Sequence, residues 1–448
     1  MYLKEGNIMT EEHHLTSSMV AEYQKIFHAR PTADVIARAV QKNGIKNASE
    51  DPTASERLHR AFSYEIKTGK PSNQRHSGRC WSFATLNTLR HKFAKKYNFK
   101  DFELSQNYLF FWDRIERANM YLQKIVETAK KPLHDRTVDF YLDFALNDGG
   151  QWANAAAIIE KYGVVPEYVM PDTHNTRDTS DVAEVENYLM RKDALVLRQL
   201  VHDGASEDEI SKTQQKMMAD VYKVAAYSFG EPPTKFDLEY RDDDKKFHQV
   251  LGLTPLKFYR EYFDTNLNDY VVVTNAPDHE YNKVYAMPTQ DSVAGGIPIK
   301  FVNVPFKYLQ ETAMKQLKAG ETVWVGNDVL QQMDRKRGLM DANLFHRAEL
   351  LDVDFTMNKK DRLATKQAMV SHAMTLTGFD LQDDQPVRWK IENSWGKDNG
   401  DNGYFVMTQD WFEEYTYEAV INKKYLSDDL KKLAEQQPVV LKAWDSLQ

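Results

Sequence analysis

The residue with the clearest chemical potential in this sequence is its one cysteine, Cys80, among 448 residues. It lies in the run SGRCWSF, residues 77–83, at the predicted start of a helix, where unpaired backbone N–H groups and the helix dipole stabilise a thiolate. A lone cysteine is more often a small buried hydrophobic residue. Gln74, six residues earlier, changes this balance, because its amide and the backbone N–H of Cys80 can together bind an oxyanion. The pair predicts a thiol nucleophile.

A thiol nucleophile needs a base close in space, and His372 is the best candidate among 13 histidines. It enters an apolar, strand-like segment, residues 371–379, where it is either such a base or a core histidine bonded to a backbone carbonyl. Asn393, 21 residues later, can accept the other ring N–H of His372, and Trp395 can shield that hydrogen bond from water. The order Gln, Cys, His, Asn predicts acyl transfer through a thiol.

The elements that must position these residues are helical early in the chain and strand-like late. Hydrophobic spacing predicts a helix of about four turns that begins at Cys80. It predicts a second helix over 104–120, with Ser105 as N-cap, and a third over 152–159. Charged runs at 206–209 and 242–246 are interpreted as solvated faces of a mostly helical insertion. Strands are predicted over 270–274, 322–326, 387–392 and 403–407. Helices first and strands later predict an α+β core with two unlike halves.

The composition excludes several classes of protein. Lys plus Arg is 58 and Asp plus Glu is 66, a net charge of −8 that gives no general attraction to nucleic acid or anionic membranes. One cysteine cannot form an intrachain disulfide or a cysteine-based metal cage. The first twenty residues contain no apolar core of a signal peptide, and no 18-residue apolar run spans a bilayer. We expect a cytoplasmic protein with no cofactor, no metal and no membrane partner.

With these residues identified, the sequence resembles the papain-like cysteine peptidases, and within them the bleomycin hydrolase / aminopeptidase C family. The broad pattern is carried by Gln74, Cys80-Trp81, Gly149-Gly150, His372 and residues 393–396. The narrower family is indicated by residues 77–83, 103–106 with 110–112, 148–152, 162–166 and 371–374. The interval from Cys80 to His372, 372 − 80 = 292 residues, far exceeds the ~130 of a plain papain domain. Such an excess fits the helical and hook-like insertions of this family.

The resemblance implies an α+β fold with a papain-like two-lobed core, one lobe helical and the other β-rich. It implies five parts: an N-terminal extension or hook over 1–60, the helical lobe over 61–171, a mostly helical insertion over 172–279, the β-rich lobe over 280–430, and a C-terminal arm over 431–448 near the active site.

The resemblance also implies roles for individual residues. It makes Cys80, His372 and Asn393 catalytic, Gln74 the oxyanion donor, and Trp81 and Trp395 supporting residues, while Gly149, Gly150 and Gln448 bind substrate. It implies a homohexamer that acts on peptides in an internal cavity, without a metal or cofactor. In this family the C-terminal segment lies in the cleft and engages the substrate's amino group, which makes the enzyme an aminopeptidase.

The C-terminal residues 443–448 leave the cleavage mode open at this point. They end a few residues earlier than the family pattern leads us to expect, which leaves room for an oligopeptide endopeptidase or for anchoring by Gln448 from slightly further back. Other readings are another Cys/His enzyme such as a transglutaminase or amidase, a nucleic-acid-binding protein, and a catalytically inactive scaffold. The complete Gln, Cys, His, Asn set disfavours the first and third, and the net charge of −8 disfavours the second.

Overall fold

The computed structural model describes residues 14–448, which divide into two compact units. The smaller unit contains the chain up to Ala54 together with Asn343–Thr356. The larger unit contains Ser55–Ala342 and Met357–Gln448, and every predicted site residue lies in it. The first thirteen residues of the N-terminal extension predicted over 1–60 lie outside the described residues.

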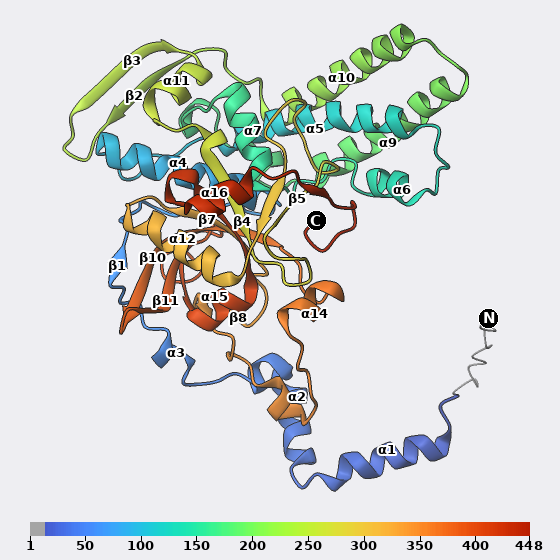
Figure 1. Cartoon of the computed structure of the whole chain (residues 1–448), viewed down its shortest axis with the longest axis vertical. Helices are drawn as coiled ribbons and strands as arrows, with labels where there is room; N and C mark the ends of the chain where they lie inside the picture. The colour runs from blue at the N-terminus through green and yellow to red at the C-terminus, as the bar shows by residue number, and fades with distance from the viewer. Residues whose placement is uncertain (1–13) are drawn as a thin grey trace. The chain divides into compact units, whose positions relative to one another are not determined.

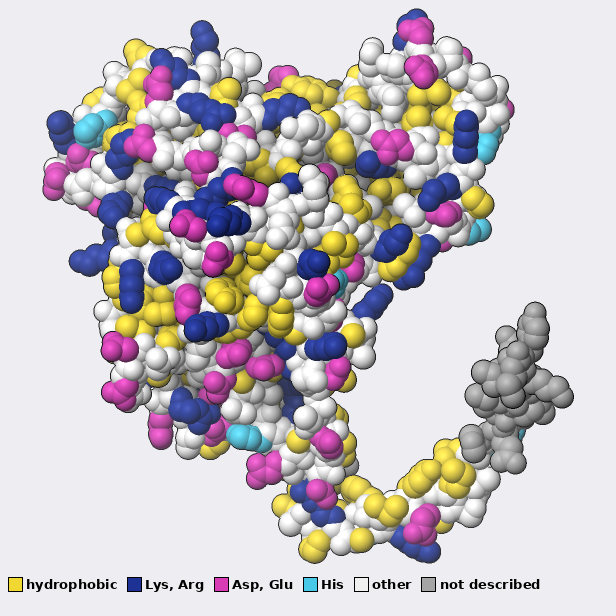
Figure 2. Space-filling model, in the orientation of Figure 1, with side chains coloured by type: hydrophobic (Ala, Val, Ile, Leu, Met, Phe, Trp, Pro, Cys, Tyr) yellow, Lys and Arg dark blue, Asp and Glu magenta, His cyan; other side chains and the backbone are white. Residues whose placement is uncertain are grey.

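The smaller unit is helical. Its helices are α1 (Ser17–Ala29), α2 (Ala33–Ala48) and α13 (Arg347–Leu351). Arg30 joins the two chain segments, because its guanidinium donates to the backbone oxygens of Leu350 at 3.0 Å and Glu349 at 3.2 Å. Helix α1 buries none of its residues, and Figure 2 shows hydrophobic side chains exposed along it.

The larger unit places a layer of helices beside a large mixed sheet (Figure 1). Its longer helices are α4 (Cys80–Tyr97), α5 (Gln106–Thr128), α6 (Arg136–Asp143), α7 (Trp152–Tyr162), α9 (Ser180–His202), α10 (Glu207–Phe229), α11 (Pro255–Tyr262) and α12 (Phe306–Lys318). Shorter helices are α3 (Ala54–Arg57), α8 (His174–Arg177), α14 (Lys359–Ala364), α15 (Gln409–Tyr415) and α16 (Asp428–Ala434). Helices α4, α5 and α7 pack against one another and carry most of the buried aromatic residues of this layer.

The sheet brings together strands from distant parts of the chain. Its strands are β1 (Tyr64–Glu65), β4 (Tyr270–Thr274), β5 (Lys283–Ala286), β6 (Lys300–Asn303), β7 (Val323–Asn327), β8 (Met333–Asp334), β9 (Leu339–Met340), β10 (His372–Gln382), β11 (Gln385–Glu392), β12 (Tyr404–Thr408), β13 (Thr416–Asn422) and β14 (Val439–Val440). Within residues 14–448 the order is β14-β5-β6-β4-β13-β7-β10-β11-β12-β9-β8, with β1 also paired to β10. Strand β10 is therefore central.

Strand β10 connects the two layers. It pairs antiparallel with β7, where His372 lies opposite Asn327, and with β11, where Thr375 lies opposite Glu392. Helix α4 packs directly on β10, and the hydroxyl of Thr375 lies 3.4 Å from the backbone oxygen of Ala84 on α4. This packing places the first residue of α4 close to the first residue of β10.

The main predicted elements are confirmed. Helix α4 begins at Cys80 and is somewhat longer than predicted, and Ser105 caps α5 by accepting the backbone N–H of Tyr108 at 3.0 Å. Along β11, Trp389 and Ile391 are fully buried, as their alternation with charged residues predicts. No helix within the described residues has both the length and the hydropathy needed to span a bilayer.

The charged run at 242–246 is mostly exposed to solvent, as interpreted, but it does not lie in a helix. It forms the turn of a hairpin between β2 (Phe236–Arg241) and β3 (Phe247–Leu253). Asp242 closes this turn by accepting the backbone N–H of Lys246 at 2.9 Å, and Lys245 adopts φ +67°. The run at 206–209 does begin a helix, with Ser206 as the N-cap of α10 and acidic residues in the first turn.

Candidate active site

Cys80 is the first residue of α4, and its thiol lies beside the strand that begins with His372. The backbone N–H groups of Ala373 and Trp81 lie close enough to the Cys80 sulfur to favour its thiolate form. Because Ala373 directly follows His372 on β10, the nucleophile and the candidate base meet at the contact between α4 and β10. The structure thus brings together two residues that are 292 positions apart, 372 − 80, in the sequence.

Burial controls the charge state of this pair. It raises the pKa of the Cys80 thiol to about 11, although the N–H groups of Ala373 and Trp81 act in the opposite direction. Burial also lowers the pKa of His372 to about 4, although its hydrogen bond to Asn393 raises it. The helix amides alone would predict a thiolate at Cys80, but burial has the larger effect. A thiolate or an imidazolium alone is disfavoured here, so the two charges are best formed together by proton transfer within the pair.

Asn393 orients the imidazole of His372. Its Oδ1 lies 2.8 Å from Nε2 of His372 and also accepts the backbone N–H of Ser394 at 2.8 Å, which fixes the direction of the amide. With Nε2 donating to this oxygen, Nδ1 carries the lone pair that can receive a proton. Asn393 is fully buried and His372 is 6% exposed. The hydrogen bond is therefore protected from water.

Trp395 covers this hydrogen bond. Its ring lies against the imidazole of His372, with ring centroids 4.8 Å apart and an interplanar angle of 32°. The guanidinium of Arg335 stacks on the Trp395 ring at 4.3 Å, and Arg335 is held by the side-chain oxygen of Asn399 at 3.1 Å. The positive charge of Arg335 also contributes to the lowered pKa of His372, after the effect of burial.

Gln74 is held by the same segment that contains Asn393. Its backbone N–H donates to the carbonyl of Ser394 at 2.8 Å, and the Ser394 hydroxyl donates to Oε1 of Gln74 at 2.5 Å. Its Nε2 donates to the carbonyl of Ser77 at 2.6 Å, in the loop that leads to Cys80. A carboxamide has two N–H bonds, and the second has no partner within residues 14–448. This N–H is the candidate oxyanion donor.

Asp148 organises the start of α4, a role that the sequence motif did not reveal. Its carboxylate accepts the backbone N–H of Gly78 at 2.6 Å and the hydroxyl of Thr179 at 2.6 Å, while its carbonyl accepts the indole N–H of Trp81 at 2.8 Å. A Cβ at position 78 would lie 2.3 Å from Oδ1 of Asp148, so only glycine fits there. Asp148 therefore fixes the loop from which Cys80 emerges.

The glycine pair lies between Trp81 and a cavity of about 380 Å³. A Cβ on Gly150 would lie 2.9 Å from the Trp81 ring, whereas one on Gly149 would face open space. Both glycines line the cavity together with Ser371, which precedes His372, and Gln448. The structure thus brings the three residues predicted to bind substrate to one cavity beside the reactive pair.

Other residues of this cavity were missed from the sequence. They include Asp291 on the loop between β5 and β6, Asn154 on α7, and Arg117 and Lys124 on α5. Asn154 donates to the carbonyl of Gln290 at 3.1 Å and to the hydroxyl of Ser292 at 2.8 Å, which holds the loop that carries Asp291 against α7. No motif identifies these residues, because their proximity arises only from the tertiary fold.

Asp291 is the one acidic side chain among the described residues that line the cavity. Its Oδ1 accepts the backbone N–H of Ile299 at 2.8 Å, and burial raises its pKa. The cationic residues of the wall already have acidic partners, Arg117 with Asp113 at 2.8 Å and Lys124 with Glu127 at 3.0 Å. Asp291 is therefore available to a cationic group in the cavity.

Comparisons with known proteins identify the family of this chain. A model of the "Peptidase C1-like family" matches residues 14–448. Aminopeptidase E of Lactobacillus helveticus is 52% identical over 436 residues, 97% of this chain and 99% of the relative, and aminopeptidase G of Lactobacillus delbrueckii subsp. lactis is 51% identical over 435 residues with the same coverage. Bleomycin hydrolase of Rattus norvegicus is 42% identical over 390 residues, 85% of this chain and 86% of the relative.

A solved structure supports the same grouping. The crystal structure of PepW from Lactobacillus rhamnosis HN001 superposes with a TM-score of 0.96 at 43% identity, over 97% of this chain and 99% of that chain. The predicted α+β papain-like fold and the predicted resemblance are both confirmed. The chain belongs to the Peptidase C1-like family, in the group that contains the aminopeptidases C and the bleomycin hydrolases.

Proposed function

We propose that this cysteine peptidase is an aminopeptidase that releases N-terminal residues from peptides. The observation that carries the proposal is the position of Gln448, which lines the same cavity as Gly149, Gly150 and Ser371. A substrate chain that extends beyond the first residue before the cleaved bond would have to pass this wall. Two of the relatives named above, aminopeptidases E and G, are aminopeptidases by name, which supports the proposal.

The proposed reaction begins with transfer of the Cys80 thiol proton to Nδ1 of His372 as the sulfur bonds to the peptide carbonyl carbon. The second N–H of Gln74 and the backbone N–H of Cys80 stabilise the negative charge that forms on the carbonyl oxygen. The C–N bond then breaks, and His372 gives its proton to the departing amine. Asn393 keeps the imidazole in one orientation through both transfers.

The second half of the reaction restores the enzyme. His372 takes a proton from water as the water oxygen attacks the thioester carbon, with the oxyanion again bound by Gln74. The C–S bond breaks, the thiolate of Cys80 recovers the proton from His372, and the carboxylic acid leaves. Because burial disfavours an isolated charge on either residue, each proton stays within the pair or moves to the reacting atoms.

Recognition of the substrate's amino terminus is assigned to Asp291 and Gln448. A free amino terminus is a cation near neutral pH, and the carboxylate of Asp291 provides the complementary charge in the cavity wall. The carboxamide oxygen of Gln448 provides a hydrogen-bond acceptor in the same wall. Together they favour a substrate whose first residue carries a free amine.

The assembly and the location are further parts of the proposal. A homohexamer in the cytoplasm is supported by the exposed apolar face of α1, which a second copy of the chain would cover, and by the thiol chemistry, which needs a reducing compartment. In such an assembly the substrates are peptides, because folded proteins do not enter an enclosed cavity.

The decisive experiment compares two peptides of one sequence, with a free and with an acetylated amino terminus. Release of single residues from the free peptide alone, identified by mass spectrometry, is the expected result. Internal cleavage of the acetylated peptide would show an endopeptidase instead. Cys80→Ser serves as the control, because it removes the nucleophile and should abolish turnover while leaving circular dichroism and molecular mass unchanged.

A further inference from the structure

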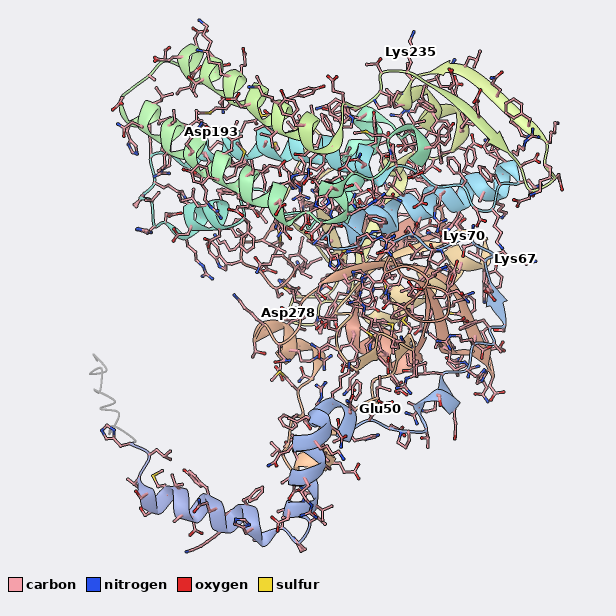
Figure 3. All side chains as sticks on the ribbon, turned by 180° about the vertical axis from the view of Figure 1, so that it is seen from behind. Glu50, Lys67, Lys70, Asp193, Lys235 and Asp278 are labelled. Atoms are coloured by element: carbon pink, nitrogen blue, oxygen red, sulfur yellow. The ribbon has the colours of Figure 1, made fainter. Side chains whose placement is uncertain are left out.

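The C-terminal segment is held against the loop after β4 by a cluster of charged side chains. His279 lies between two carboxylates, with Nδ1 3.0 Å from Oδ1 of Asp278 and Nε2 3.1 Å from Oδ1 of Asp445. Asp278, labelled in Figure 3, also accepts the hydroxyl of Ser446 at 2.6 Å. Two residues of the loop thus bind two consecutive residues of the C-terminal segment.

Asp445 links this attachment to the end of the segment through two hydrogen bonds. Its carboxylate accepts the backbone N–H of Leu447 at 3.1 Å, and its carbonyl accepts the backbone N–H of Gln448 at 3.1 Å. Leu447 is fully buried in the core of the helical layer. The position of Asp445 therefore determines where Gln448 meets the cavity.

The groups around His279 favour its charged form. Burial alone would lower its pKa, but the hydrogen bonds to Asp278 and Asp445 outweigh burial and raise the pKa to about 9. The ring of Tyr285 on β5 also packs against the imidazole, with centroids 5.1 Å apart, and its hydroxyl donates to the carbonyl of Glu280. Near neutral pH an imidazolium joins two carboxylates that would otherwise repel each other.

The segment has other attachments, and they lie further from Gln448. Strand β14 pairs in parallel with β5, and the backbone N–H of Leu441 donates to the carbonyl of Ala286 at 2.9 Å. The guanidinium of Arg136 stacks on Trp444 at 4.0 Å. These contacts bring the segment to the cavity, whereas the cluster around His279 holds its last described turn.

We propose that His279 is a positioning residue that holds the C-terminal segment in place, so that Gln448 limits the cavity to one substrate residue before the cleaved bond. This inference rests on the proposed aminopeptidase function. The residue touches neither the substrate nor the reacting pair and acts through Asp445. Removing it should free the last turn of the segment and open the cavity to longer substrates.

The test uses His279→Ala and Asp445→Asn, which disrupt the same contact from its two sides. The matched control is His248→Ala, because His248 also pairs with an aspartate, Asp242 at 2.8 Å, but on the β2–β3 hairpin. Two quantities are measured in each full-length protein: hydrogen–deuterium exchange of residues 439–448, and the ratio of cleavage rates for the acetylated and free-amine peptides.

We expect faster exchange of residues 439–448 in both variants and not in the control, with a rise of about tenfold or more in the cleavage ratio. Unchanged exchange would overturn the proposal whether or not the parent cleaves peptides. Faster exchange with an unchanged ratio, or with an equal fall of both rates, would also overturn it, because the segment would then not select substrates. Failure of the parent to cleave the free-amine peptide would instead reject the aminopeptidase function.

Discussion

At the scale of single residues, the site depends on groups whose orientation is fixed by hydrogen bonds made on their other sides. Asn393 presents its oxygen to His372 because the same oxygen is bound by the N–H of Ser394. Gln74 presents its amide group toward the loop before Cys80 because Ser394 binds its oxygen. One serine therefore sets the direction of both carboxamides, which reduces the reorganisation that catalysis requires.

Gln74→Ala should lower kcat by about 10²–10³-fold with little change in KM, because one donor to the transition-state oxyanion is lost. The measurement is steady-state kinetics on a free-amine peptide. Gln249→Ala is the matched control, since Gln249 lies on β3 and bonds only to Glu239 at 2.6 Å. A rise in KM at constant kcat would contradict the assigned role.

Asp291→Asn should raise KM for a free-amine peptide by roughly tenfold at nearly constant kcat, because a charged contact made equally in ground and transition states is lost. Steady-state kinetics on the free-amine peptide give KM and kcat, and circular dichroism checks the fold of each variant. Asp208→Asn, an exposed site on α10, should behave as the parent does. A fall in kcat at constant KM, or an altered circular dichroism spectrum, would contradict a role of Asp291 in recognition of the amine.

At the scale of elements, strands β7 and β13 place an unpaired carboxyl group in the core behind the site. Glu418 on β13 lies opposite Gly326 on β7, is 1% exposed, and its Oε1 has no hydrogen-bond partner within residues 14–448. A Cβ at position 326 would lie 3.2 Å from Oε2 of Glu418 and 3.0 Å from Val370, a residue of the cavity wall. The group therefore lies directly beneath that wall.

Burial raises the pKa of Glu418 from 4.5 to about 8, so the folded protein keeps a proton that the unfolded chain releases above 4.5. Stability should fall as pH rises from about 4.5 to 8, on the order of 1.4 kcal/mol per pH unit at most. Glu418→Gln should remove this dependence and make the protein more stable than the parent at pH 8.

Urea unfolding at pH 5, 6.5 and 8 measures the Glu418 effect. The exposed Glu435 supplies the control substitution, Glu435→Gln, which should follow the parent at each pH. The unfolding midpoints of the parent and of Glu418→Gln are compared at each pH. If they differ by the same amount at all three pH values, the assigned ionisation of Glu418 is wrong.

Some elements could be predicted from the sequence and others could not. Helix α4 and strand β11 follow from hydrophobic spacing, and Cys80, His372 and Asn393 follow from residue types in a fixed order. The β2–β3 hairpin could not be predicted, because a run of charged residues is as common in an exposed turn as on an exposed helix face.

Asp148 lies within the motif of residues 148–152, but its contact with Gly78, 70 residues away, is seen only in the structure. His279 and Asp291 lie outside every motif; their partners are 166 and 8 residues away, and their residue types are ordinary for loops. Nothing local distinguishes them from solvated side chains. Only the tertiary fold shows which of them face a partner or a cavity.

At the scale of the whole molecule, α1 provides the surface for the proposed assembly. The hydrophobic residues exposed on and just before this helix are Leu15, Met19, Val20, Tyr23, Ile26 and Phe27. Single exposed apolar residues are ordinary, but an exposed apolar face of this size on one helix favours α1 as the contact surface of the proposed assembly. Each chain has a mass of 52.0 kDa, so six chains would have a mass of about 312 kDa, 6 × 52.0.

The double substitution Ile26→Glu with Phe27→Glu should reduce the mass measured by light scattering toward that of smaller species, because charges would be buried in the contact. Lys25→Glu is the control, since Lys25 is exposed and its one ion pair among the described residues is with Glu22. A parent that is already monomeric, or a double variant with the mass of the parent, would reject α1 as the contact.

The contact between Gln74 and Ser394 has a consequence for when activity appears during synthesis. Gln74, the proposed oxyanion donor, depends on Ser394, which is 320 residues later in the chain. At about 5–20 residues per second, a ribosome needs roughly 16–64 s to make that stretch. Throughout this interval Cys80 has been made, but its base, its oxyanion donor and its cavity wall have not been assembled. The nascent chain is therefore inactive as a peptidase until almost all of it has been translated, which protects neighbouring unfolded chains from cleavage.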